Sequence, residues 1–325
     1  TQYGYIADAG VLLESLTYLF IGAEKLNLDL LRRSLETTKK DCRVFNMYGP
    51  TECTIISAVL EIHRAKPLEL LYAHLTSIPI GVPVGNTTLL VLDRNLELTP
   101  INTAGELYIG GEGVAAGYLN DPGKSARAFL DNPYKNKGIK GPRLYKTGDW
   151  SRWLEDGTVE FLGRIDHQVK IRGYRIELGE IENRLLSHPA VKEAVVLNFS
   201  GETGKNHREQ YLCAYIVPAA KEAVDLKEYL SGFLPEYMIP PVFMEIDHIP
   251  LNPNGKIDRS ALPLPVPKGE KTRIAPRDKM EEQLAAIWAE VLGIEPTHPV
   301  GIDDNFFERG GHSLKATVLV SRVQK

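Results

Sequence analysis

The sequence is poor in cysteine, and this shortage excludes two classes of protein. Only three of the 325 residues are cysteine, namely Cys42, Cys53 and Cys213. Their wide spacing matches neither a zinc-binding pattern nor a disulfide framework. Isolated thiols are typical of chains that fold in a reducing compartment, so we expect a cytoplasmic protein.

Long apolar runs and an excess of positive charge are also missing. A membrane-spanning helix needs about 20 predominantly apolar residues in a row, and no run in the sequence provides them. The opening residues TQYGYIADAG have neither the basic start nor the apolar centre of a signal peptide. The formal net charge of −4 at pH 7 argues against a nucleic-acid or membrane partner.

The composition present is that of a folded multidomain protein, with 43% hydrophobic and 25% charged residues. Apolar runs at 17–23 and 43–48 are typical of buried strands, and Asn27 is a suitable N-cap for a helix between them. The apolar face of that helix would comprise Leu28, Leu31 and Leu35. This order predicts a β-α-β unit with parallel strands.

Composition divides the rest of the chain into further regions. Residues 76–165 are rich in glycine, proline and strand-like segments, without helical periodicity. Residues 166–265 mix strands with helices and predict a small α+β domain. Residues 266–276, rich in proline and charge, are typical of a linker before a last region at 277–325.

The stretch NMYGPTE, residues 46–52, directly follows the second predicted strand. In open α/β sheets, ligands bind at the carboxyl ends of the strands. The Gly49-Pro50 turn would leave Tyr48, Thr51 and Glu52 on the rim of a loop, where they could stack on a base, hold a phosphate and bind Mg²⁺. On this stretch alone, an ordinary β-α turn with a solvated glutamate is the better-supported interpretation.

The dipeptide Asp156-Gly157 lies between strand-like segments and predicts a β-hairpin. If the loop has two residues, counting outward along the strands places Asp149 opposite Arg164. The carboxylate could then accept both hydroxyls of a ribose while the guanidinium faces a phosphate. The alternative is a cross-strand salt bridge worth less than about 1 kcal/mol.

Two segments further along the chain present lysines. Residues 168–182 begin with a strand that has one cationic face, which includes Lys170, and Gly173 then permits a tight turn. Residues 252–259, NPNGKIDR, form a turn that presents Lys256. A lysine-protected edge strand and a solvated loop lysine are the alternatives.

Helical periodicity returns in the last region. Asp278 and Glu281 resemble a capping box. The apolar stripe of this helix would comprise Met280, Leu284, Ile287, Val291 and Leu292. Further on, GGHSL places Ser313 at the start of a second helix, where it could be a common serine cap. A helix N-terminus also favours an attached phosphate group.

Together these stretches resemble the adenylation domains of nonribosomal peptide synthetases. The matching stretches, in family order and near family spacing, are NMYGPTE, GELYIGGEGVAAGYL, YKTGD, GRIDHQVKIRGYRIELGEIE, LPEYMIP and NPNGKIDR. DNFFERGGHSL then resembles the attachment motif of a peptidyl carrier domain. Each stretch is moderately specific, but the ordered set covers almost the whole chain and is very specific.

The resemblance implies a multidomain α/β and α+β fold. Residues 1–165 would be the C-terminal part of the large adenylation subdomain, α/β at 1–75 and β-rich at 76–165, with a distorted β-barrel. Residues 166–265 would be a mobile α+β lid. Residues 277–325 would be an incomplete helical carrier domain.

The implied activity is that of an ATP-dependent amino-acid ligase of secondary metabolism, such as antibiotic biosynthesis. An amino-acid carboxylate attacks the α-phosphate of ATP, pyrophosphate leaves, and the aminoacyl group then passes to a carrier thiol as a thioester. The first step brings two anions together, so it needs cations fixed where negative charge develops. The resemblance gives that role to Lys256.

Other roles follow from the same resemblance. The nucleotide would be held by Asn46, Tyr48, Thr51, Asp149 and Arg164, with Tyr48 stacked on adenine and Asp149 on the ribose hydroxyls. Glu52 would bind Mg²⁺. Asp166 would be the hinge of the lid, and Lys170 and Gly173 would face the active site during thioester formation. Ser313 would carry 4′-phosphopantetheine, attached by a phosphopantetheinyl transferase.

The resemblance also implies a wall that selects the amino-acid side chain. It would comprise Leu19, Ile21, Met47, Ile55 and Ile56. All five are apolar, so we expect an apolar or aromatic substrate.

Two features of the family are absent from the sequence: a Ser/Thr/Gly-rich phosphate loop upstream of residues 46–52, and an acidic residue for the substrate amine. We therefore expect a fragment of a larger synthetase, flanked by partners such as condensation domains and inactive by itself, with weak ATP binding at most. Alternatives are an acyl- or aryl-CoA ligase, against which GGHSL argues, and a non-catalytic binding or interaction piece.

Overall fold

A computed structural model describes residues 13–323, apart from 14, 65–66, 140, 167, 172, 204–206, 220–223, 253–256, 266–273, 293, 295–298 and 307–312. The chain divides into two compact units, residues 1–173 and 174–325. Each has its own apolar core. Each is therefore described by itself.

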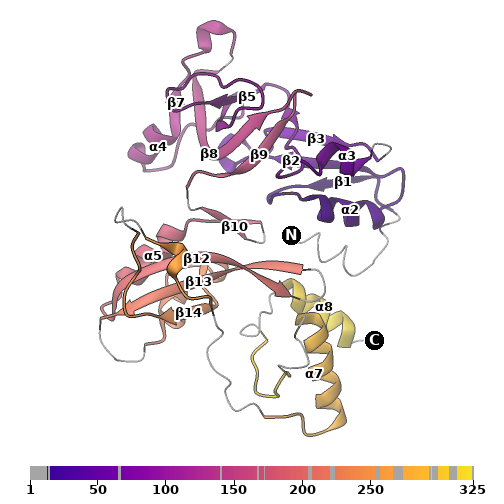
Figure 1. The fold of residues 1–325 in the computed structure, drawn as a ribbon, viewed down its shortest axis with the longest axis vertical. Coiled ribbons are helices and arrows are strands. Elements are labelled where there is room, and N and C mark those ends of the chain that lie inside the picture. The colour runs from indigo at the N-terminus through magenta and orange to yellow at the C-terminus, as the bar shows by residue number, and fades with distance from the viewer. Residues whose placement is uncertain are drawn as a thin grey trace. The chain divides into compact units, whose positions relative to one another are not determined.

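The first unit begins with a four-stranded sheet of order β1-β2-β3-β4 (Figure 1). Its strands are β1 (Tyr18–Ile21), β2 (Arg43–Tyr48), β3 (Ala58–Ile62) and β4 (Val82–Pro83). Helix α2 (Leu28–Glu36) connects β1 to β2, and these two strands are parallel. The predicted β-α-β unit is thus confirmed.

Helix α2 begins where the sequence predicts. The Asn27 side chain is the N-cap, because its Oδ1 accepts a hydrogen bond of 2.8 Å from the Leu30 amide. The buried face is centred on Leu30, Leu31 and Ser34. Leu28 and Leu35 lie at the edge of this face and are half-buried. The buried face of the helix is therefore rotated by part of a turn from the predicted apolar stripe.

The second sheet has the order β5-β6-β8-β7, with β9 also paired to β8 (Figure 1). Its strands are β5 (Thr87–Leu92), β6 (Gly105–Gly111), β7 (Phe129–Asp131), β8 (Arg143–Trp153) and β9 (Val159–Arg164). Helices α3 (Leu68–Tyr72) and α4 (Pro122–Ala128) complete the larger elements of this unit, which ends with β10 (Val169–Ile171). In the described part of the chain this sheet is open, so the expected barrel is not closed.

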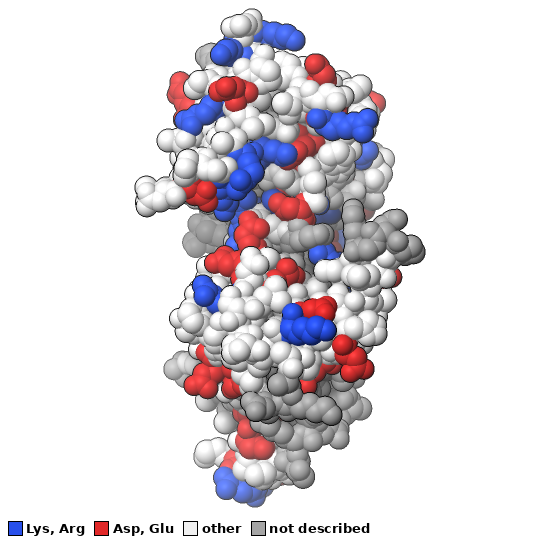
Figure 2. Space-filling model, turned by 90° about the vertical axis from the view of Figure 1, so that its left-hand side faces the viewer, with Lys and Arg blue, Asp and Glu red and all other residues white. Residues whose placement is uncertain are grey.

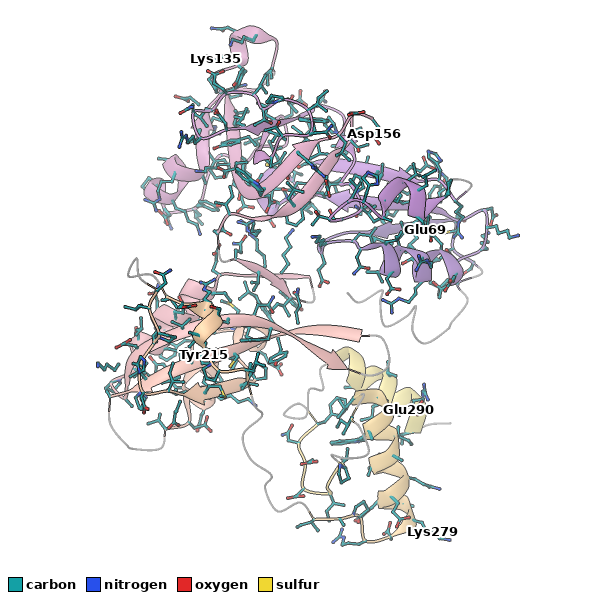
Figure 3. The ribbon with its side chains drawn as sticks, viewed as in Figure 1. Glu69, Lys135, Asp156, Tyr215, Lys279 and Glu290 are labelled. Carbon is teal, nitrogen blue, oxygen red and sulfur yellow. The ribbon has the colours of Figure 1, made fainter. Side chains whose placement is uncertain are left out.

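The β8–β9 hairpin confirms the predicted pairing of Asp149 with Arg164. The strand register between the turn and this pair differs from the predicted one. The loop has three residues rather than two, because the Leu154 amide bonds to the Thr158 carbonyl at 2.8 Å. Asp156 lies at this turn (Figure 3). The inner register is therefore shifted by one residue. A β-bulge at Leu162 removes the shift and restores the predicted pair at the open end.

The second unit contains the predicted α+β arrangement. Its three-stranded sheet has the order β12-β13-β14, and Tyr215 lies among its packed side chains (Figure 3). The elements are β11 (Tyr174–Ile176), α5 (Leu178–Leu186), β12 (Val191–Thr203), β13 (His207–Pro218), α6 (Leu226–Ser231) and β14 (Val242–Glu245). Short 3-10 turns in the two units are η2 (Lys135–Lys137), η3 (Glu236–Met238) and η4 (Arg259–Ala261).

The last part of this unit is helical, with α7 (Lys279–Leu292) and α8 (Ser313–Val323). Asp278 caps α7 as predicted, since its Oδ1 accepts hydrogen bonds from the Met280 and Glu281 amides at 2.9 Å. Glu281 reaches back to the Arg277 amide rather than to that of the cap. Of the predicted apolar stripe, Leu292 is buried, whereas Met280 is 78% exposed.

The three cysteines are buried and free, as their spacing predicts. Within the described ranges, no helix is both long enough and apolar enough to cross a membrane. Basic and acidic side chains are interspersed over the face displayed in Figure 2.

Candidate functional site

A cavity opens at the carboxyl ends of β1 and β2 in the first unit. It is lined by Ala23 and Glu24 after β1, by Tyr48 and Gly49 at the end of β2, and by Lys170 of β10. Strand ends are where open α/β sheets bind ligands. The cavity thus brings together two stretches that the sequence separates by more than a hundred residues.

Tyr48, Asp149 and Arg164 form a hydrogen-bonded network within this unit. The Tyr48 hydroxyl donates to Asp149 Oδ2. Arg164 Nη1 donates to Asp149 Oδ1 at 2.7 Å, and Arg164 Nε donates to Asp166 Oδ1 at 2.6 Å. Asp149 is 4% exposed, whereas the Asp166 side chain is 50% exposed, so Arg164 connects a buried carboxylate to an exposed one.

The electrostatics of the network keep Tyr48 as a hydrogen-bond donor. Burial of the phenol, and then the nearby Asp149 carboxylate, raise the pKa of Tyr48 well above its usual value. An ionised carboxylate offers about four lone-pair sites. The two side-chain donors use one site on each oxygen of Asp149, so the carboxylate retains capacity for two further hydroxyl donors.

The side-chain amide of Asn46 is buried and hydrogen-bonded to the backbone. Its Nδ2 donates to the Pro79 carbonyl at 2.8 Å, and the residue is 3% exposed. Ile78 and Ile80 line the cavity, so this bond ties the end of β2 to another segment that lines it. The predicted nucleotide contact of Asn46 stays a prediction.

Thr51 and Glu52 belong to the short turn η1 (Thr51–Cys53) that follows β2. Thr51 is exposed and Glu52 is half-buried. Tyr118 donates its hydroxyl hydrogen to Glu52 Oε1 at 2.7 Å, and the Ala115 amide donates to the Glu52 carbonyl at 2.9 Å. Glu52 is therefore held on both its backbone and its side chain by one loop.

The chemistry of Glu52 fits a Mg²⁺ ligand. Mg²⁺ prefers oxygen donors and is usually held by one or two carboxylates together with substrate phosphates. Among the described residues, no group of three or more His, Cys, Asp or Glu side chains could hold a metal ion. A metal here would thus rely on Glu52 and on the oxygens of a bound nucleotide.

Lys170 and Gly173 contact residues that line the cavity. Lys170 Nζ lies 5.7 Å from the centre of the Tyr48 ring, a cation–π distance. Gly173 has φ +82° and donates its amide hydrogen to Glu24 Oε1 at 2.7 Å. The segment that the resemblance assigns to thioester formation is therefore anchored on this cavity.

The five residues predicted for the selectivity wall differ in their burial and surroundings. Strand pairing puts Leu19 and Ile21 on the sheet face that packs under α2, where they are 7% and 4% exposed. Met47 points to the opposite face, because side chains alternate along a strand. Met47 lines the cavity, whereas Leu19 and Ile21 are buried in the apolar cluster under α2, and their place in the wall stays a prediction.

Ile55 and Ile56 lie on the loop that follows Glu52, and they are 71% and 39% exposed. Thr54 and Ile55 have φ values of +61° and +71°, which β-branched residues rarely adopt. The Ile56 amide bonds to the Thr54 carbonyl at 2.9 Å, which closes a tight turn around Ile55. The loop therefore presents Ile55 outward on a strained backbone.

Two predicted residues cannot be placed in the site. Lys256 lies outside the described residues. Ser313 is the first residue of α8, as the sequence predicts, but its side chain is not described. Their roles stay predictions.

Sequence reasoning missed Glu24 and Tyr118. Glu24 directly follows the first strand, so the rule on strand ends could have found it. Tyr118 belongs to the recognised stretch GELYIGGEGVAAGYL, but 66 residues separate it from Glu52. No spacing in the sequence signals that contact.

Comparison with known families agrees with this arrangement. Residues 3–119 match the AMP-binding enzyme family, residues 180–256 match the AMP-binding enzyme C-terminal domain, and residues 282–325 match the phosphopantetheine attachment site. The three matches follow one another in the order that the sequence motifs predict.

Relatives among characterised proteins are large synthases. The chain is 48% identical to tyrocidine synthase 2 of Brevibacillus parabrevis over 302 residues, which are 91% of this chain and 8% of that protein. It is 45% identical to gramicidin S synthase 2 of Brevibacillus brevis over 314 residues, which are 96% of this chain and 7% of that protein. The chain thus spans less than a tenth of either relative.

Solved structures show the same similarity. The chain is similar to holo-PA1221, an NRPS protein with adenylation and PCP domains, with a TM-score of 0.70 and 29% identity over 95% of this chain and 48% of that one. It is also similar to NpsA-ThdA, an artificially fused adenylation-PCP di-domain from Klebsiella oxytoca, with a TM-score of 0.58 and 26% identity over 95% of this chain and 47% of that one.

The cavity at the strand ends and the matches at 3–119 and 180–256 define the class: the chain belongs to the AMP-binding, adenylate-forming enzymes. A phosphopantetheine attachment site follows in the same chain, and the relatives at 45–48% identity are peptide synthases. More particularly, therefore, it is a member of the nonribosomal peptide synthetases, with adenylation-domain sequence followed by carrier-domain sequence.

Proposed function

We propose that the protein containing this chain activates an amino acid with ATP and loads it as a thioester on the carrier domain that follows. The observation that carries this proposal is the Tyr48–Asp149–Arg164 network together with the cavity that Tyr48 lines. It supplies an aromatic face for a base, a buried carboxylate for ribose hydroxyls and a guanidinium for phosphate.

The family resemblance and this geometry together suggest a role for each residue. Tyr48 stacks on adenine, while Asp149 accepts hydrogen bonds from the ribose and is itself oriented by Arg164. Bound Mg²⁺ would neutralise phosphate charge, and Glu52 would hold it. Lys256 stabilises the charge that develops at the α-phosphate as the amino-acid carboxylate attacks and pyrophosphate leaves. The carboxyl group releases no proton in this step, because it attacks as the ionised carboxylate.

The proposed partners follow from the same assignment. A phosphopantetheinyl transferase modifies Ser313, and neighbouring synthetase domains, such as condensation domains, receive the loaded amino acid. Of the predicted wall residues, Met47 lines the cavity, and Ile55 and Ile56 are exposed. The apolar character of the predicted wall supports an apolar or aromatic amino acid. Three free thiols support a cytoplasmic location.

Substitutions in the full-length protein separate the two half-reactions. Lys256→Ala should suppress amino-acid-dependent exchange of pyrophosphate into ATP by at least about a hundredfold, since one preorganised cation or donor is typically worth that much. Ser313→Ala should leave exchange unchanged and abolish covalent loading, measured as a mass increase on the carrier peptide.

Lys279→Ala is the matched control, because Lys279 is an exposed lysine at the start of α7 (Figure 3). It should leave both half-reactions unchanged. Normal exchange by the Lys256→Ala protein would contradict the assignment of the adenylation step.

An acyl- or aryl-CoA ligase is the second candidate, because such enzymes share the AMP-binding fold. The attachment-site match at 282–325 favours the carrier over free coenzyme A as acceptor. Incubation with a phosphopantetheinyl transferase and coenzyme A should add phosphopantetheine to Ser313. A Ser313 peptide of unchanged mass, together with acyl-CoA release, would support the ligase instead.

A further inference from the structure

The hydroxyl of Tyr118 donates a hydrogen bond to Glu52, and none of the motifs described above assigns Tyr118 a role in the reaction. We propose that Tyr118 is a positioning residue that orients Glu52 for metal binding. This inference rests on the proposed function, in which Glu52 binds Mg²⁺. It concerns a second residue, which acts on the metal only through Glu52.

The loop 111–118 clamps the turn that carries Glu52. Tyr118 donates to Glu52 Oε1 at 2.7 Å, and the Ala115 amide donates to the Glu52 carbonyl at 2.9 Å. A third bond joins Thr54 Oγ1 to the Gly113 carbonyl at 2.8 Å. The turn is thus held at its backbone and at two side chains, and only the Tyr118 bond reaches the carboxylate among these three.

The loop can form these bonds because two of its glycines let it approach the neighbouring segments closely. A Cβ atom on Gly113 would lie 3.1 Å from the Cys53 carbonyl oxygen, and one on Gly117 would lie 2.8 Å from Ser125 Oγ. Gly117 also has φ +147°, a backbone conformation that favours glycine. Glycines at these two places let the loop pack directly against η1 and against α4.

Tyr118 is itself held from several sides. Its amide donates to Ser125 Oγ at 2.8 Å. Its ring meets Phe129 edge-on with centroids 5.4 Å apart, and Lys124 Nζ lies 4.7 Å from the ring centre. With the backbone and the ring both fixed, the hydroxyl has one defined position, and it can impose that position on Glu52.

This arrangement matters for a metal ligand on a loop. A glutamate side chain with no fixed partner samples many rotamers, and binding a metal would then require ordering it. A hydrogen bond from a rigid phenol removes that requirement, as partners of metal ligands commonly do. Loss of such a partner typically weakens metal affinity or activity 10- to 100-fold, so an effect of about this size is expected.

Tyr118→Phe in the full-length protein tests the inference, because phenylalanine keeps the ring that packs on Phe129. Mn²⁺ binding in the presence of ATP, measured by electron paramagnetic resonance, should weaken by about 10-fold or more. The Mg²⁺ concentration that half-saturates pyrophosphate exchange should rise in parallel, while the rate at saturating Mg²⁺ is largely retained.

Tyr108→Phe is the matched control. Tyr108 is 2% exposed and donates to Glu106 Oε2 at 3.3 Å, so the variant also removes a phenol–carboxylate bond, but at a place with no proposed part in the reaction. It should leave Mn²⁺ binding unchanged. A Glu52→Gln protein supplies the second test, since Tyr118→Phe should add no further loss in that background.

The outcomes distinguish this inference from the proposed function. Unchanged Mn²⁺ affinity of the Tyr118→Phe protein, or losses that simply add to those of Glu52→Gln, would overturn the inference and leave a packing role alone. A wild-type protein that shows no pyrophosphate exchange with any amino acid would instead overturn the proposed function.

Discussion

Asp149 is the residue on which most of the predicted nucleotide contacts converge. It is buried, and it accepts hydrogen bonds from a phenol and a guanidinium on its two oxygens. These two donors fix the orientation of the carboxylate. Arg164 therefore does more than bridge two strands: it orients the group that we propose accepts hydrogen bonds from the ribose hydroxyls.

Asp149→Asn should raise KM for ATP by about 10- to 100-fold. A hydrogen bond to a charged group contributes about 1.5–3 kcal/mol, and 1.4 kcal/mol corresponds to a factor of ten. KM for the amino acid should change much less. Pyrophosphate-exchange kinetics with each substrate varied in turn measure both constants.

Asp156→Asn is the control for this substitution. Asp156 Oδ1 accepts hydrogen bonds from the Thr158 amide and hydroxyl at the hairpin turn, so the variant changes a hydrogen-bonded aspartate of the same hairpin outside the network. It should leave KM for ATP unchanged. Equal effects of the two variants on both substrates would mean that Asp149 is only structural.

The contacts of single residues differ in how far sequence determines them. The Asp149–Arg164 pair follows from counting along one hairpin, because both partners lie on adjacent strands. The Tyr48–Asp149 bond joins residues 101 apart in different sheets, and no local pattern encodes it. The same is true of Glu24 and Gly173, which are 149 residues apart.

At the scale of elements, the hairpin shows that a correct pair can follow from an incorrect register. A turn signal such as Asp-Gly locates a hairpin but does not set its loop length, and the bulge at Leu162 has no signature in the sequence. The burial of Leu19 and Ile21 under α2 could not be predicted from their strand alone. Alternation fixes which side chains share a face, but an apolar strand buried on one side does not reveal which face is the core.

The loop after Glu52 permits a prediction in which a polar substitution stabilises the fold. Ile55→Asn should raise the free energy of unfolding by about 1 kcal/mol, because left-handed backbone costs a residue other than glycine about 1–3 kcal/mol and asparagine tolerates it best. Little apolar burial is lost, since Ile55 is 71% exposed. Urea unfolding followed by circular dichroism measures the change.

Ile101→Asn provides the comparison, because Ile101 is 59% exposed and is not among the residues with positive φ. It should give no gain in stability. If both variants are equally stable, the backbone at Ile55 is not strained in the folded protein.

At the scale of the molecule, each of the two units has its own core. Leu31 is fully buried in the first and Ile181 in the second. Changes of composition along the chain are what the sequence offers for dividing it into regions. The sequence does not predict the open second sheet: β7 and β9 both pair with β8, and this sharing depends on the length of β8 rather than on any local pattern.

Separate cores predict separate responses to core substitutions. Leu31→Ala should destabilise residues 1–173 by about 2–5 kcal/mol, and Ile181→Ala should do the same to residues 174–325. Hydrogen exchange read by mass spectrometry should show lost protection confined to the substituted unit. Loss of protection spread equally over both units would show that they unfold as one.

The turn at Ile55 has a consequence for how such a protein changes over evolutionary time. The backbone there is fixed by the approach of Gly49, whose Cβ would lie 2.4 Å from the Ile55 carbonyl oxygen, while the side chain projects away from the fold. Mutations can therefore exchange the side chain without repacking the core. The side chain at this position can thus vary while the fold stays intact. In the proposed selectivity wall, single substitutions at Ile55 would then be a route by which a descendant protein acquires a new substrate preference.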